Sequence, residues 1–188
     1  MIKQRGQIVT DKILDTAERL FFHQGYNITG INQIIEESDI AKNSLYKHFE
    51  SKAYLLLAYL QRWHKNGFER LETTINKVAD RKQKLLAIFE YYRESQVQGG
   101  YGGCRFVKAN DEAGMIDERV LAEIQSAKYD LKDFIARLVA DSGHKQLLTD
   151  EELTELIFML LEGGIVSSGI FKHAGDLQSA AAIIQKLI

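Results

Sequence analysis

The absence of proline from all 188 residues is the feature that most constrains the fold of this chain. Proline fixes φ and lacks a backbone donor, so it interrupts helices wherever it falls inside them. Apolar residues instead recur at helical spacing along most of the chain, and the sequence has no strand-like alternation and no internal repeat. These observations predict an all-α fold in which glycine and aspartate make the breaks.

Short polar or glycine-containing segments separate the expected helices. Thr29 is predicted to be an N-cap, because its hydroxyl can accept a bond from a free backbone N–H. Ser38-Asp39 predicts a turn, and the glycine cluster at 99–103 predicts a loop or hinge. The expected helices cover 10–24, a short stretch through 31–35, then 41–48, 52–78, 82–98, 106–112, 117–141, 150–171 and 176–187.

Composition excludes several classes of protein. A single cysteine rules out a disulfide framework and a multi-cysteine zinc site, and it fits a reducing cytoplasm. The five histidines are scattered, and the glycine cluster lacks the Lys-Ser/Thr of a phosphate loop. We therefore expect no metal, no cofactor and no catalytic residue. Because the N-terminus lacks an apolar signal core and charges interrupt the apolar runs, we also expect no segment that spans a bilayer.

The net charge of −2 conceals an asymmetry along the chain. Residues 1–65 carry nine Lys+Arg against seven Asp+Glu, whereas residues 66–188 carry fifteen against nineteen. Residues 41–52 hold three Lys and one His against a single Glu. The total charge is therefore no argument against a nucleic-acid partner, because a local basic segment can bind phosphates.

The first 50 residues predict three short helices, the second and third joined by a tight turn, which together form a helix-turn-helix candidate. Branched residues around the turn, such as Ile34, Ile40 and Leu45, can hold the two helices together. Short polar or basic side chains are expected on the outward face of the third helix, where they suit a major groove about 12 Å wide. These residues are Lys42, Asn43, Ser44, Lys47 and His48.

The run ITGINQIIEESDIAKNSLYKHFESKAYLL resembles the DNA-binding segment of the TetR family (TetR/AcrR type) of bacterial transcriptional regulators. The most specific part is SLYKHFESK, Ser44 to Lys52, and the preceding helix is similar through Phe21-Phe22 and Gly25. About the first 60 residues carry the match. The resemblance implies a helix-turn-helix DNA-binding domain over residues 1–52 and a larger helical effector-binding and dimerisation domain over 53–188.

The sequence departs from the family pattern at three positions. Ser38-Asp39 stands where members commonly have Ala-Gly, so Asp39 has to tolerate a left-handed backbone conformation. Ala41 replaces the usual Ser or Thr cap, and Asn43, which can read adenine, replaces a common glycine. The motif class is intact, but family operator contacts cannot simply be transferred.

The resemblance implies a division of labour at the DNA. Thr29, Tyr46, His48 and Lys52 would contact backbone phosphates, and Lys42, Asn43, Ser44 and Lys47 would face base edges. Two alternatives stay open from the residues alone. The three lysines could form an ordinary solvated face, and Tyr46 could be half-buried packing.

The C-terminal part offers a dimerisation surface in Leu153–Phe171. Its expected members combine an apolar stripe with small residues that permit close approach: Leu153, Ile157, Leu160, Leu161, Gly164, Ser167 and Ser168. The alternative is that this helix forms the core of the monomer. The resemblance implies that the last helix also contributes, giving a four-helix contact between two subunits.

The resemblance further implies a small-molecule pocket among the middle helices. The candidate lining residues are aromatic or soft, and core packing is the alternative for each: Trp63, Phe89, Tyr92, Phe106, Met115, Phe134 and Phe158. Cys104 beside Arg105 would act as an oxidant or electrophile sensor if that charge stabilised its thiolate; the alternative is an inert, buried cysteine.

These patterns lead to one expected function and one alternative. We expect a cytoplasmic, homodimeric, ligand-responsive repressor that binds a palindromic double-stranded DNA operator and is released by a small-molecule effector. The alternative is a helical interaction protein that keeps the fold but acts mainly through a protein partner.

Overall fold

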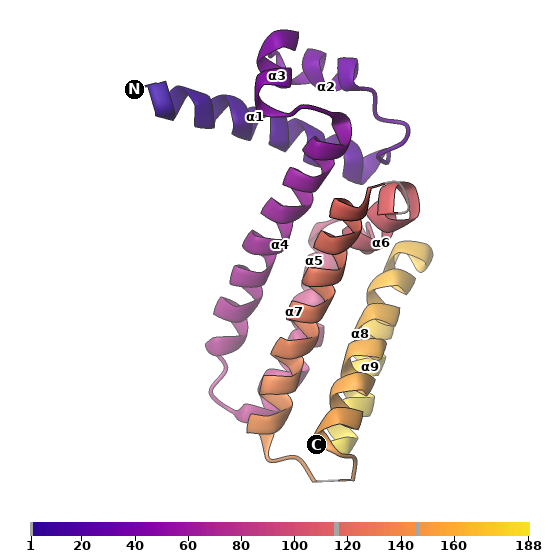
Figure 1. Cartoon of the computed structure of the whole chain (residues 1–188). Coiled ribbons are helices and arrows are strands. Elements are labelled where there is room, and N and C mark those ends of the chain that lie inside the picture. Colours follow the sequence, from indigo (N-terminus) through magenta and orange to yellow (C-terminus); the bar gives the residue numbers. More distant parts are fainter. Residues whose placement is uncertain (1, 115–116, 146) are drawn as a thin grey trace. The chain divides into compact units, whose positions relative to one another are not determined.

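The computed structural model describes residues 2–114, 117–145 and 147–188, and within these ranges the chain is helical without strands (Figure 1). The all-α prediction is confirmed. The elements are α1 (Ile2–His23), α2 (Ile31–Ser38), α3 (Lys42–His48), α4 (Lys52–Asn76), α5 (Arg81–Gln98), α6 (Arg105–Ala109), the π-helical turn η1 (Asn110–Gly114), α7 (Glu118–Ser142), α8 (Asp150–Phe171) and α9 (Gly175–Leu187).

Local signals in the sequence explain where most helices begin and end. Gly25, just after α1, takes a φ of 94°, and Asp39, the C-cap of α2, takes the left-handed conformation with φ 51°. The Ser51 hydroxyl accepts a bond from the Tyr54 backbone amide at 3.1 Å and so caps the N-terminus of α4. Thr149 and Glu152 form a capping box at the start of α8. Because no strong breaker precedes Thr10, α1 begins earlier than predicted.

The predicted cap at Thr29 is wrong. The N-cap of α2 is Gly30, which makes no side-chain capping bond. The Thr29 side chain is fully buried, and its hydroxyl donates to the Gly25 carbonyl at 2.6 Å. Threonine therefore stabilises the preceding loop rather than the helix N-terminus, since its Oγ1–H bonds backward along the chain.

The chain forms two compact units. The first contains residues 1–65 and 105–125, and the second contains residues 66–104 and 126–188. The helix-turn-helix predicted over residues 1–52 lies within the first unit, which also takes in the first part of α4, α6, η1 and the start of α7. Its core includes Ile13, Phe21, Ile34, Leu45 and Phe49, all buried.

In the second unit, α8 packs against α5 and α9. Gly164 allows a close approach, because a Cβ at this position would lie 2.6 Å from Leu177 Cδ2. This packing overturns part of the predicted dimer surface. Five of its seven residues are buried within the chain's own core, where a partner cannot reach them: Leu153, Ile157, Leu161, Gly164 and Ser168. Leu160 and Ser167 are only partly buried.

The apolar residues of α8 lie on two faces. Besides the buried face, Met159, Val166 and Ile170 are exposed, and with Gly163 they follow the helical spacing i, i+4, i+7, i+11. We call these four residues the outer stripe. Because both faces are apolar, α8 is long and apolar enough to cross a membrane by length and composition alone, a test that buried core helices also pass; 39% of its apolar 18-residue window is buried within the chain.

Candidate nucleic-acid interface and effector site

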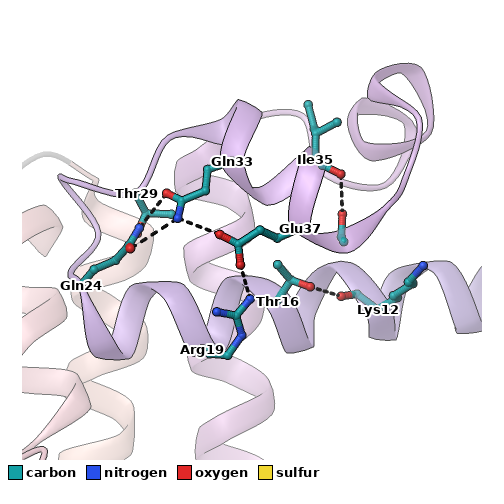
Figure 2. Close-up of polar contacts among 9 residues, drawn as sticks. Lys12, Thr16, Arg19, Gln24, Thr29, Gln33, Ile35 and Glu37 are labelled. Atoms are coloured by element: carbon teal, nitrogen blue, oxygen red, sulfur yellow. Dashed lines mark hydrogen bonds and ion pairs between the residues drawn. The ribbon is translucent and has the colours of Figure 1, made fainter.

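A polar network holds α2 against α1 (Figure 2). Arg19 of α1 pairs with Glu37 of α2, and Gln33 Nε2 donates to the same carboxylate at 2.8 Å. Gln33 Oε1 in turn accepts from Gln24 Nε2 at 2.7 Å (Figure 2). The hydrogen bond from Arg19, followed by that from Gln33, lowers the pKa of Glu37. The network fixes the orientation of α2 by charge and geometry in addition to apolar packing.

The turn between α2 and α3 is built on Asp39. Its left-handed conformation lets the Asp39 amide bond to the Glu36 carbonyl at 3.1 Å and the Ile40 amide bond to Ile35 at 3.3 Å. Ala41 then starts α3 without a side-chain cap, as the sequence predicts. The turn thus works with the departures from the family pattern, at the cost of one strained residue and one missing cap.

Helix α3 separates its apolar and polar residues cleanly. Leu45 within α3 and Phe49, its C-cap, are buried, which agrees with their i, i+4 spacing on one apolar face. No acidic residue occurs in α3. Its exposed residues are polar, aromatic or basic: Lys42, Asn43, Tyr46 and Lys47. Ser44 is partly buried. An exposed face of this kind suits phosphates and base edges.

The other predicted DNA contacts are less accessible. Thr29 is fully buried with its hydroxyl engaged inside the first unit, so the structure removes it from the interface. His48 is partly buried, with Nδ1 3.1 Å from Thr10 Oγ1. Lys52 places its ammonium 4.2 Å from the centre of the Tyr26 ring. Burial lowers the pKa of Lys52, and the negative charge of Glu112 opposes this shift.

Two predicted effector residues lie in the first unit and are engaged there. Trp63 stacks on the Arg105 guanidinium, whose carbon lies 3.8 Å from the ring centre. Phe106 makes an edge-on contact with His64, with ring centres 6.3 Å apart. These contacts are internal packing, which was the alternative reading of both residues.

The remaining aromatic candidates belong to the second unit. Phe89 and Phe134 are buried in its core, so the structure supports packing for both. Tyr92 and Phe158 are partly buried at the edge of that core. Met115 lies outside the described residues.

Cys104 has a different charged neighbour from the one expected. Lys128 Nζ lies 3.4 Å from Cys104 Sγ and 2.6 and 2.7 Å from the carboxylate oxygens of Glu162. Arg105 instead places its guanidinium against aromatic rings in the first unit. Burial is the largest influence on Lys128 and lowers its pKa, but the charges of Cys104 and Glu162 outweigh it, so the pKa is raised.

We call Tyr92, Cys104, Lys128 and Glu162 the polar cluster. The pKa of its tyrosine is shifted as well. Burial, then the charges of Tyr91, Glu162 and Cys104, raises the pKa of Tyr92 far above its ordinary value. The sequence reasoning missed Lys128 and Glu162. A signal existed for the lysine, because it interrupts the apolar face formed by Ile124, Ala127 and Leu131 of α7.

Comparison with known proteins agrees with this geometry. Residues 13–59 match the family model described as bacterial regulatory proteins, tetR family. The transcriptional activator FasR of Mycolicibacterium smegmatis is 29% identical over 75% of this chain and 61% of its own length. The transcriptional repressor NemR of Escherichia coli K12 is 22% identical over all of this chain and 98% of its own length.

Solved structures share the fold over nearly the whole chain. The reduced form of Escherichia coli NemR has a TM-score of 0.82 at 19% identity and covers 96% of this chain and 97% of its own. The Streptomyces coelicolor regulator SCO4454 has a TM-score of 0.86 at 20% identity, covering 95% and 93%. At such identities these structures establish the fold, while the family match rests on the helix-turn-helix segment.

Proposed function

We propose that the chain is a transcriptional regulator of the TetR family, whose model its residues 13–59 match, and that it is a repressor that binds a palindromic operator as a homodimer and is released by a small-molecule effector. The observation that carries the proposal is the exposed face of α3, with its lysines, asparagine and tyrosine and no acidic residue. Repression is preferred over activation because a relative that is similar along nearly its whole length, NemR, is named a repressor.

The proposed DNA contacts follow from exposure and chemistry. Asn43 can bond an adenine through N6 and N7, and Lys42 and Lys47 can donate to guanine or to phosphates. Tyr46 is exposed and can donate its hydroxyl to a phosphate oxygen. Ser44, His48 and Lys52 are partly buried and would take secondary roles.

The proposed dimer contact uses the outer stripe of α8 in place of the buried residues. A single helix-turn-helix makes few contacts, so dimers that span half-sites about 34 Å apart are usual. Ile183 of α9 is also exposed and would add to the contact. Gly163 in the middle of the stripe has nothing within 4 Å of a Cβ built on it, which leaves room for a partner helix to approach.

The proposed effector site is centred on the polar cluster of Tyr92, Cys104, Lys128 and Glu162, with Phe158 at the same edge of the core. A partly buried ammonium and a carboxylate can orient a polar ligand, and a neighbouring thiol adds reactivity toward electrophiles. Effector and DNA would then bind antagonistically, because each would favour a different spacing of the two recognition helices.

Titration of the full-length chain with DNA from upstream of its gene, at several salt concentrations, tests the proposal. We expect sequence-specific binding that weakens steeply with salt. Lys47→Ala is expected to cost about 1–3 kcal/mol in operator binding, whereas Lys77→Ala, an exposed lysine in the second unit, should leave binding unchanged.

Two results would contradict the proposal. Binding without preference for any genomic sequence would favour the protein-interaction alternative. Lower expression of the target genes after deletion of the regulator would indicate activation and would overturn the repressor assignment.

A further inference from the structure

Three charged side chains, spaced i, i+3, i+7 from Arg105 to Glu112, contact α1 and the loop that follows it. All of these residues lie within the first unit. The first is Arg105, whose guanidinium carbon lies 3.7 Å from the centre of the Phe22 ring and 3.8 Å from that of Trp63. Its Nη1 also donates to the Tyr59 hydroxyl at 3.0 Å. Guanidinium stacking between two aromatic faces is a strong anchor when partly buried.

The second contact comes from Lys108, one turn later. Its ammonium donates to the Phe22 carbonyl at 3.3 Å and lies 4.8 Å from the centre of the Phe22 ring. That carbonyl belongs to the last turn of α1, where helix carbonyls lack partners within the helix. Lys108 therefore stabilises the C-terminal end of α1 by both hydrogen bonding and charge.

The third contact reaches the loop between α1 and α2. Glu112 of η1 accepts a hydrogen bond from the Asn27 amide at 2.6 Å, across 85 positions of sequence. The carboxylate packs tightly against Gly25, where a Cβ would lie 2.9 Å from Glu112 Oε1. Glycine is thus required at this position both for its φ of 94° and for the approach of the carboxylate.

The loop held by Glu112 leads directly into the DNA-reading helices. Within it, the Gly25 carbonyl accepts from both the amide and the hydroxyl of Thr29, and Gly30 then caps α2. A shift of this loop would move the N-terminus of α2 and, through the tight turn at Asp39, also α3. The carboxylate sits on a π-helical turn, an element that recurs at functional sites.

We propose that Glu112 is a positioning residue for DNA binding: its carboxylate fixes the loop after α1, so that the conformation of residues 105–114 sets the affinity of α3 for the operator. This inference rests on the proposed function and names a regulatory contact within it. Residues 105–114 follow the glycine loop and Cys104 in the chain, so a change at the proposed effector site can reach the contact between Glu112 and the loop after α1 through the backbone.

The test compares Glu112→Ala and Glu112→Gln with a matched control, Asp111→Ala, which removes an exposed carboxylate from the same turn. Operator affinity is measured by fluorescence anisotropy on the full-length proteins. We expect Glu112→Ala to weaken binding about fivefold or more, within the usual range of coupling between sites. Glu112→Gln keeps an acceptor for Asn27 and should lie between Glu112→Ala and the wild type.

The proposal is overturned if Glu112→Ala binds operator within threefold of the Asp111→Ala control. Hydrogen exchange of the amides of residues 26–30 gives a second readout that does not require DNA. We expect faster exchange there in Glu112→Ala and Glu112→Gln but not in Asp111→Ala; unchanged exchange would equally overturn the positioning role of Glu112. If the wild type binds no operator while the exchange result holds, the proposed function and the effect on operator affinity fail, whereas the contact by which Glu112 fixes the loop after α1 stands.

Discussion

Replacing Ile170 by alanine tests which face of α8 meets a partner. The side chain is 68% exposed in the single chain, and full burial of such a side chain is worth about 1.5–3 kcal/mol. Covering the exposed part would therefore contribute about 1–2 kcal/mol in each copy. In a two-fold symmetric contact the same residue contributes from both copies. The free energy of dimerisation lost in the variant is therefore about 2–4 kcal/mol.

That loss corresponds to an increase of about 30- to 700-fold in the dimer dissociation constant. Sedimentation equilibrium over a wide concentration range measures it directly. Ile8→Ala is the matched control, because Ile8 is 62% exposed but lies on α1 in the first unit. A dissociation constant for Ile170→Ala within threefold of that control would refute the argument that the outer stripe is the dimer surface.

Three further predictions concern the turn, the thiol and the α1–α2 network. Asp39→Gly should raise the thermal midpoint slightly and Asp39→Ala should lower stability by about 1 kcal/mol, because only glycine takes the left-handed conformation freely; equal midpoints would contradict this. N-ethylmaleimide should weaken operator binding of the wild type but not of Cys104→Ser, since the chain has no other cysteine; an unchanged response in the variant would remove the sensor role. The pKa of Glu37 is lower in the folded than in the unfolded chain, so its contribution to stability is present above the unfolded pKa and is lost as pH falls through the folded pKa. Arg19→Gln should therefore flatten the acid limb of the stability profile measured by denaturant titration, and an unaltered limb would argue against the pair.

Local patterns in the sequence were sufficient for the helices and for the helix-turn-helix. Leu45 and Phe49 follow i, i+4 spacing and are buried, and Asp39 takes the strained conformation that its position in the turn requires. Such features depend on residues within one or two helical turns of each other, so they can be predicted from the local sequence. The prediction that Thr29 caps α2 was wrong although capping is also a local property. The Gly25 carbonyl is equally close in sequence and accepts the hydrogen bond of the Thr29 hydroxyl.

The candidate sites depended on contacts between distant residues. Lys128 lies beside Cys104 although 24 positions separate them, and Glu112 meets Asn27 across 85. A lysine on the apolar face of an amphipathic helix can be recognised as unusual from the sequence. Which residue it contacts, however, depends on how the helices pack.

By itself, the sequence determined that this chain is helical, that a helix-turn-helix lies within its first 60 residues, and which side chains α3 presents. Only the tertiary structure decided which face of α8 is inside. Both faces are apolar, so periodicity could not rank them, and the choice fell to the close packing of Gly164 against Leu177. That packing buries the stripe predicted for a partner and leaves Met159, Gly163, Val166 and Ile170 exposed, because a helix can turn only one of two similar faces toward its own core.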